Sequence, residues 1–149
     1  MEILSQEMDK VAVRIPKTTA TVATSHKINA ARLEYEMIGR VWKSKGTNWT
    51  ILYDNTREIG PVLKPTYSRV ITVRVVDDIF DTVKFANSDI QTIGLAASSQ
   101  RKIQYAEQVA RQGVARLPDI GRMTNFDMPW DGFNFIEKVI RWVTLGGPV

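Results

Sequence analysis

The sequence of 149 residues contains no cysteine and a single histidine, His26. The absence of cysteine excludes disulfides, thiolate metal sites and a cysteine nucleophile on this chain. One histidine is too few for a zinc site of the usual histidine-rich kind. A Ser-His-Asp arrangement through His26 stays formally open, but no GxSxG nucleophile elbow accompanies it. The chain is therefore poor in catalytic side chains.

Long apolar runs are also missing. No stretch approaches the roughly 18 apolar residues that a membrane-spanning helix needs, and no apolar region follows Met1 as it would in a signal peptide. Hydrophobic residues make up 44% of the chain and charged residues 24%, a balance typical of a soluble globular protein. We therefore expect a cytoplasmic protein with no membrane partner, folded as one domain over residues 1–149.

Positive charge is concentrated in the first half of the chain. Residues 1–75 hold twelve Lys and Arg against seven Asp and Glu, whereas residues 76–149 hold eight against nine. A basic half can indicate a polyanion partner such as nucleic acid or a phosphorylated cofactor. The basic residues are dispersed, with Glu34 and Glu36 among them, and this favours a solvated helix face. Nucleic acid is therefore not the expected partner.

Hydrophobic periodicity and breaker residues predict alternating helices and strands. Pro16 ends the first helix, Ser25 is the predicted N-cap of the second, and Asp77 with Asp78 caps the third. Strands that alternate with helices favour an α/β layer with a largely parallel sheet. The predicted helices cover residues 1–15, 26–44, 79–85, 100–111 and 133–143. The predicted strands cover residues 49–53, 70–76, 90–97 and 114–117, and residues 58–68 are predicted to be irregular.

Small and acidic residues offer two motifs with competing interpretations. Gly94-Leu-Ala-Ala97 lies between a predicted strand and a helix, where a phosphate-binding turn can form. A dinucleotide fingerprint needs three glycines, so close packing of small residues is the favoured interpretation. Asp77, Asp78 and Asp81 could hold a metal, but capping and the helix dipole already explain acidic residues at that position.

Pro129-Trp130-Asp131-Gly132 is the densest unusual cluster, with Phe133 and Phe135 close behind. Aromatic residues beside glycine and proline on a loop can wall a ligand pocket. The same residues can also clamp a loop onto the core, with Asp131 capping the last helix. Both interpretations stay open at the level of the residues.

Several segments resemble a known family. The run Asn87-Ser-Asp-Ile-Gln-Thr-Ile-Gly-Leu-Ala-Ala-Ser-Ser-Gln-Arg101 is similar to the late catalytic-domain segment of aldehyde dehydrogenases. Gly113-Val-Ala-Arg-Leu-Pro-Asp-Ile-Gly-Arg-Met123 and Trp130-Asp-Gly132 resemble more specifically the C-terminal end of the long-chain acyl-CoA reductase of bioluminescence operons. Trp49-Thr-Ile51 and Arg69 to Asp78 fit the same pattern, so the resemblance covers roughly residues 45–145.

The resemblance implies an α/β, three-layer-like parallel sheet with flanking helices. It also implies a reductase that converts an acyl thioester to an aldehyde with NADPH. In that family a cysteine thiolate accepts the acyl group, and hydride then reduces the new thioester while hydrogen-bond donors stabilise the oxyanion. Both the cysteine and the cofactor-binding domain precede the matched region. The chain is therefore expected to be the C-terminal portion of the catalytic domain, inactive alone, with no catalytic residue and no metal ligand of its own.

By the same resemblance, four residues are expected to shape the substrate or cofactor pocket: Gly94, Arg122, Trp130 and Asp131. Glu58-Ile-Gly-Pro-Val62 is similar to the ribose-binding element of aldehyde dehydrogenases, but it lacks that element's phenylalanine and lies too far before the next strand. We assign Glu58 no role. The expected partners are the missing N-terminal part of the reductase or homologous subunits. The alternative is a non-enzymatic interaction or oligomerisation module derived from the same fold.

Overall fold

The computed structural model describes residues 1–18, 20–56 and 68–147. The chain forms two compact units, Met1–Asp78 and Ile79–Val149, which are described separately below as unit 1 and unit 2. The expectation of one domain over residues 1–149 stays a prediction. The predicted irregular stretch, Glu58 included, lies outside the described residues except for its last residue, Ser68, which is in a turn.

Unit 1 contains a three-stranded mixed sheet in the order β1-β2-β3. Strand β1 (Gly39–Lys43) pairs antiparallel with β2 (Thr50–Asp54), and β2 pairs parallel with β3 (Val70–Arg74). The predicted strands at 49–53 and 70–76 are thus confirmed to within two residues. The predicted sheet was largely parallel, and the antiparallel β1-β2 pair corrects that prediction.

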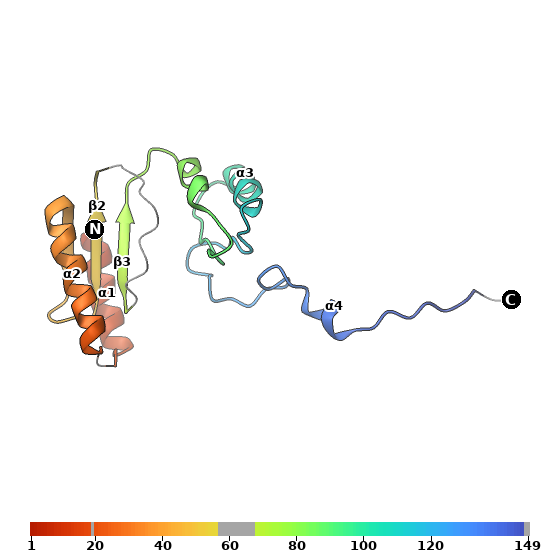
Figure 1. Cartoon of the computed structure of the whole chain (residues 1–149), viewed down its shortest axis with the longest axis horizontal. Coiled ribbons are helices and arrows are strands. Elements are labelled where there is room, and N and C mark those ends of the chain that lie inside the picture. Colours follow the sequence, from red (N-terminus) through yellow and green to blue (C-terminus); the bar gives the residue numbers. More distant parts are fainter. Residues whose placement is uncertain (19, 57–67, 148–149) are drawn as a thin grey trace. The chain divides into compact units, whose positions relative to one another are not determined.

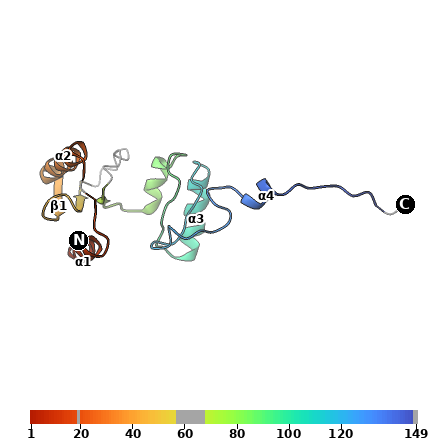
Figure 2. The same ribbon diagram turned by 90° about the horizontal axis from the view of Figure 1, so that it is seen from below.

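One helix covers each face of this sheet (Figures 1 and 2). Helix α1 (Glu2–Arg14) packs Met8 against Ile51, and helix α2 (Val22–Ile38) packs against the face that holds Thr50. Successive side chains of a strand point to opposite faces. Because β2 is the central strand and both its faces are covered, Thr50, Ile51 and Leu52 are all buried.

The first helix is fixed to the sheet by two tryptophans. Trp42 Nε1 donates a hydrogen bond to Glu2 (2.7 Å), and Trp49 Nε1 donates one to Asp9 (2.8 Å). A short amphipathic helix needs a surface to pack on, and the predicted helix at 1–15 finds that surface within this chain.

Helix α2 begins earlier than predicted. Its N-cap is Thr21, whose Oγ1 accepts a hydrogen bond from the Thr24 backbone N–H (3.2 Å). The predicted cap, Ser25, instead lies in the first turns of the helix, where its own N–H donates to the Thr21 carbonyl. Several hydroxyl residues near this point of the sequence could each cap helix α2. The hydrogen bond to Thr21 Oγ1 identifies Thr21 as the cap.

Helix α2 also ends earlier, at Ile38 rather than near residue 44. Gly39 to Lys43 pair with β2 instead, so the predicted helical end at these residues is wrong. A Cβ added to Gly39 would lie 1.9 Å from the Tyr53 carbonyl oxygen. Only glycine permits this approach between the two strands, and the five residue pairs of the ladder outweigh the helical periodicity of the sequence.

Unit 2 is built around helix α3 (Ser99–Ala110), which confirms the helix predicted at 100–111. Residues Ile79–Phe85 form a 3-10 helix, η1, at the position where a helix was predicted. The Tyr105 ring packs edge-on against Phe80, and its hydroxyl lies 2.7 Å from Thr82 Oγ1. The buried core of this unit consists of Ala86, Leu95, Tyr105, Val109 and Val114.

The two strands predicted on either side of α3 are present only as isolated bridges. Thr92 pairs with Arg116 and Leu95 with Asp119, both in parallel orientation. The direction agrees with a strand-helix-strand crossover. Regular strands at 90–97 and 114–117 are nevertheless not formed, because Pro118 has no N–H to extend the ladder. The last predicted helix, 133–143, is also shorter: α4 covers Phe135–Val139 only.

The fold class is α/β, with a small mixed sheet rather than a largely parallel one. The parallel three-layer arrangement implied by the aldehyde dehydrogenase resemblance is not confirmed. Within the described ranges, none of the helices combines the length and the apolar character needed to cross a membrane. The cytoplasmic location stays a prediction.

Candidate functional site

All four predicted pocket residues lie in unit 2. Gly94 contacts the loop that follows Pro118: a Cβ added to it would lie 2.7 Å from Met123 Sδ and 3.5 Å from Ile120 Cγ1. The glycine therefore makes room for the Met123 side chain. This agrees with the close-packing interpretation of the Gly94 motif.

Arg122 lies on the same loop but is exposed. Its backbone N–H donates to the Asp119 carbonyl (3.0 Å), and its carbonyl accepts from Asn125 (3.0 Å), so it forms part of a turn. The hydrogen bond and charge of Lys102, with a smaller contribution from Arg122, hold the pKa of Asp119 below its ordinary value. Arg122 is thus an exposed turn residue whose charge acts on Asp119.

The Trp130 ring contacts both an arginine and a second aromatic ring. The Arg116 guanidinium is 3.9 Å from the centroid of the Trp130 ring, and Phe126 stacks on Trp130 at 4.8 Å with an interplanar angle of 18°. Arg116 also donates to the carbonyls of Met123 (3.3 Å) and Asn125 (2.9 Å). A cation over an indole is an attractive arrangement, and here it fixes the loop and the tryptophan together.

Asp131 is held in a left-handed backbone conformation (φ +49°), followed by Gly132 (φ +77°). Its Oδ2 accepts a hydrogen bond from Gln91 Nε2, while its Oδ1 is buried and has no hydrogen-bond partner among the described residues. The N-cap of α4 is Asn134, so the expected capping role of Asp131 is not observed. Asp131 instead ties the loop to the segment that precedes α3.

The four predicted residues are therefore brought together only in part. Gly94 and Arg122 are linked through the loop that contains Met123, and Arg116 connects the same loop to Trp130. Sequence reasoning did not identify Arg116. A lone arginine in a predicted core strand was the available signal, since a charge inside an apolar strand needs a partner.

The residues of this cluster do not fit a dinucleotide cofactor by themselves. The Gly94 turn is filled by Met123, and the sequence offers no glycine triplet to cradle a pyrophosphate. In the described part of the chain, no group of three or more His, Cys, Asp or Glu is placed to bind a metal ion. What the cluster provides is a wall of aromatic and cationic side chains.

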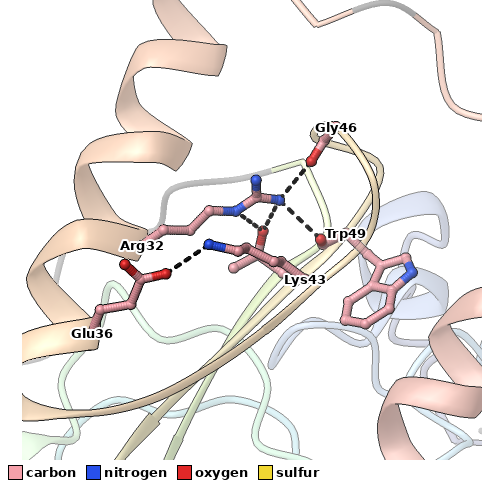
Figure 3. A network of polar contacts seen from close by, with 6 residues as sticks. Arg32, Glu36, Lys43, Gly46 and Trp49 are labelled. Atoms are coloured by element: carbon pink, nitrogen blue, oxygen red, sulfur yellow. Dashed lines mark hydrogen bonds and ion pairs between the residues drawn. The ribbon is translucent and has the colours of Figure 1, made fainter.

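Unit 1 contains a second polar cluster, centred on the buried side chain of Arg32 (Figure 3). Arg32 donates to Thr50 Oγ1 (2.7 and 2.9 Å) and to the carbonyls of Gly46 (2.9 Å) and Trp49 (3.2 Å). The nearby Glu36 carboxylate is bound by Lys43 (2.6 Å). Burial lowers the pKa of Arg32, which the charge of Glu36 partly offsets. Arg32 thus fastens α2 to the β1-β2 turn through neutral acceptors.

The comparisons with known proteins identify a family. No curated protein matches the chain. The family model "Acyl-CoA reductase (LuxC)" matches residues 1–142, which extends the resemblance noted for residues 45–145 to nearly the whole chain. This confirms the resemblance to fatty acyl-CoA reductases of the bioluminescence type. Because the match covers well over half of the sequence, the chain belongs to the acyl-CoA reductase (LuxC) family.

Proposed function

We propose that this chain is a portion of an NADPH-dependent acyl-CoA reductase that contributes packing surfaces and pocket walls but not the nucleophile. The family match supports the reaction class, in which an acyl thioester is reduced to an aldehyde. The proposal that the chain does not supply the nucleophile rests on the complete absence of cysteine from the 149 residues. Without a thiolate the chain has no group to accept an acyl chain from coenzyme A as the family resemblance implies.

The chemistry assigned to this chain is therefore positioning. NADPH supplies the hydride when it is bound by the complete reductase. Trp130, backed by Arg116 and Phe126, offers a rigid apolar wall of the kind that lines ligand pockets. Asp131 adds an acidic group next to Trp130 in the chain, and Arg122 adds an exposed basic group on the loop that Arg116 connects to Trp130.

The C-terminal segment supports a role within a larger assembly. Eight apolar side chains between residues 133 and 145 are exposed, a density that monomeric proteins rarely leave in contact with water. We propose that the rest of the reductase, or homologous subunits, covers them. The exposed residues are Phe133, Phe135, Ile136, Val139, Ile140, Trp142, Val143 and Leu145.

The test is an acyl-transfer assay on the purified chain. An acyl-CoA with a radioactive acyl group is added with NADPH, and both protein-bound label and NADPH oxidation are measured. We expect neither from this chain, and both from a cysteine-containing reductase of the family run in parallel. Aldehyde formation by the 149-residue chain alone would refute the proposal.

A non-enzymatic interaction module is the second candidate, favoured by the same exposed apolar segment. Analytical ultracentrifugation discriminates the two. Self-association of the chain through this segment supports the module. A monomer that binds a separately produced, cysteine-containing reductase portion and restores NADPH oxidation supports the enzyme portion.

A further inference from the structure

Unit 1 contains a pocket of about 300 Å³ that the reductase chemistry does not use. It lies where the loop after α1, the start of α2 and the residues before β3 meet. Its charged lining side chains are both cationic, Lys17 and Arg69, and no Asp or Glu among the described residues lines it. The remaining lining residues are small or carry a hydroxyl: Thr18, Ala20, Thr21, Thr24 and Ser68.

The cations at this pocket are bound only to neutral acceptors. Lys17 Nζ donates to the carbonyls of Thr47 (2.7 Å) and Ser68 (3.4 Å). Arg69 Nη2 donates to the Ile15 carbonyl (2.5 Å), while Arg69 Nη1 is buried and has no hydrogen-bond partner in the described structure. A lysine has three donors and an arginine five, so both side chains have more donors than acceptors in the described structure.

The two pocket cations and Arg32 also act on each other. Burial lowers the pKa of Lys17, and the positive charges of Arg69 and Arg32 lower it further. Neither pocket cation nor Arg32 forms an ion pair with a described carboxylate. Arg32 donates its hydrogen bonds to Thr50 and two backbone carbonyls. Cations that repel one another in a partly desolvated place are stabilised most by an anion placed among them.

The start of α2 adds donors of the right kind. The first backbone N–H groups of a helix have no partner within the helix and carry the positive end of its dipole. In α2 the Thr24 N–H is taken by Thr21 Oγ1 and the Ser25 N–H by the Thr21 carbonyl, so the positive end of the dipole lies beside the pocket, which is lined here by Thr21 and Thr24. The Thr21 and Thr24 hydroxyls, 2.9 Å apart, lie at the same end.

We propose that this pocket binds a phosphate group, with Lys17 and Arg69 as its charged ligands and the hydroxyls of Thr21 and Thr24, at the start of α2, as a further donor. A tetrahedral dianion with several acceptor oxygens matches a pocket lined by two cations and by hydroxyl side chains at a helix start. A carboxylate has fewer acceptors and one charge. The site does not depend on the reductase role, because it stands on unit 1 alone.

Isothermal titration calorimetry with inorganic phosphate at constant ionic strength tests the proposal on the 149-residue chain. We expect saturable binding by the wild type. Lys17→Gln and Arg69→Gln should each weaken it by roughly tenfold or more, because each removes a charge-assisted hydrogen bond. The matched control is Lys27→Gln, which removes an exposed charge from helix α2. It should change binding by less than about threefold, because solvent and ions screen that charge.

Amide NMR of the wild type gives a test that requires no variant to fold. Added phosphate should shift the N–H resonances of Thr21 and Thr24, which line the pocket, and leave those of Ile51 and Leu52 in place. Absence of saturable phosphate binding, or equal weakening by Lys27→Gln and Lys17→Gln, would overturn the proposal.

Two nucleotide probes identify where the phosphate comes from. Adenosine 3′,5′-bisphosphate carries the phosphates of the nucleotide end of coenzyme A, and adenosine 2′,5′-bisphosphate carries the 2′-phosphate that distinguishes NADPH from NADH. Tighter binding of one probe than of inorganic phosphate, lost in Lys17→Gln, assigns the site to that source. Equal or weaker binding of both assigns it to free phosphate.

Discussion

The two units of this chain bury their apolar side chains in different ways. In unit 1 a central strand is covered on both faces, and Ile51 and Leu52 are withdrawn from water by helices that belong to the same unit. In unit 2 the core gathers around one face of α3, and the segment after residue 132 leaves its apolar side chains exposed. A sheet between two helices closes its own core, whereas a single helix on two extended segments closes only one side. Unit 1 should therefore be the self-sufficient part of the chain.

The largest expected effect comes from deleting core volume. Ile51→Ala should destabilise unit 1 by about 2 to 5 kcal/mol, since Ile51 is fully buried and its neighbours can relax only partly. Val109→Ala is the matched change in unit 2, at an equally buried position with a smaller side chain. Amide hydrogen exchange measures the two units separately. Protection lost in unit 1 after Val109→Ala, to the same extent as in unit 2, would contradict their independence.

The next effect in size is expected at Arg32. Arg32→Met should cost unit 1 about 1 to 3 kcal/mol, because Thr50 and the carbonyls of Gly46 and Trp49 lose their donor. Urea unfolding measures the loss of free energy. Arg40→Met, at an exposed arginine of the neighbouring strand, is the control and should be nearly neutral. Equal losses in both variants would show that the buried hydrogen bonds do not stabilise unit 1.

In unit 2 the Arg116–Trp130 contact should contribute less to stability than the hydrogen bonds of Arg32 do in unit 1. Arg116→Met should cost about 1 kcal/mol, the value of one partly exposed cation–π contact. The main result should be faster hydrogen exchange in residues 123–133, whose carbonyls Arg116 holds at Met123 and Asn125. Arg122→Met, on the same loop, is the control. Unchanged exchange after Arg116→Met would remove the basis for treating Trp130 as a rigid wall.

The smallest effects should appear only in acid. Burial raises the pKa of Asp54, but hydrogen bonds from Thr56 and the charge of Arg74 outweigh it, so the pKa lies below its ordinary value. A lowered folded-state pKa stabilises the fold above the unfolded value of about 3.9 and ceases to do so as pH falls through the folded value. After Asp54→Asn, the free energy of unfolding of unit 1 should therefore depend less on pH in acid solution.

In unit 2 the hydrogen bond and charge of Lys102 also lower the pKa of Asp119, but the Asp119 side chain is exposed. Its contribution should be smaller than that of Asp54 and should disappear in high salt, because solvent and ions screen an exposed pair. Unfolding curves of Asp54→Asn and Asp119→Asn from pH 7 to acid, at low and high salt, make the comparison. A larger, salt-resistant effect at Asp119 would contradict this ranking.

Local signals in the sequence predicted part of the fold. The helix at 99–110 was identified from its apolar spacing and from Gly113, which adopts φ +99° three residues after Ala110. The strands β2 and β3 were identified from runs of β-branched and apolar residues. The end of α2 was missed because Val41 and Trp42 continue its helical periodicity, and their pairing with Leu52 and Ile51 is not encoded nearby.

The candidate site was predictable to a similar degree. Trp130 and Asp131 attracted attention as an unusual cluster, and both make specific contacts. Arg116 lies fourteen positions before Trp130 in the sequence, and only folding brings its guanidinium over that ring. The same is true of Lys17 and Arg69, which approach each other only because the loop after α1 meets the residues before β3.

The sequence by itself determined the absence of a cysteine nucleophile, the family and the α/β class, because composition, motifs and periodicity are properties of the chain read in order. The tertiary structure decided the direction of the strands, the end of α2 and the partners of every buried charge. Those depend on contacts between residues distant in sequence. A local pattern carries no information about which neutral or charged group will lie opposite Arg32, Lys17 or Arg69 once the chain has folded.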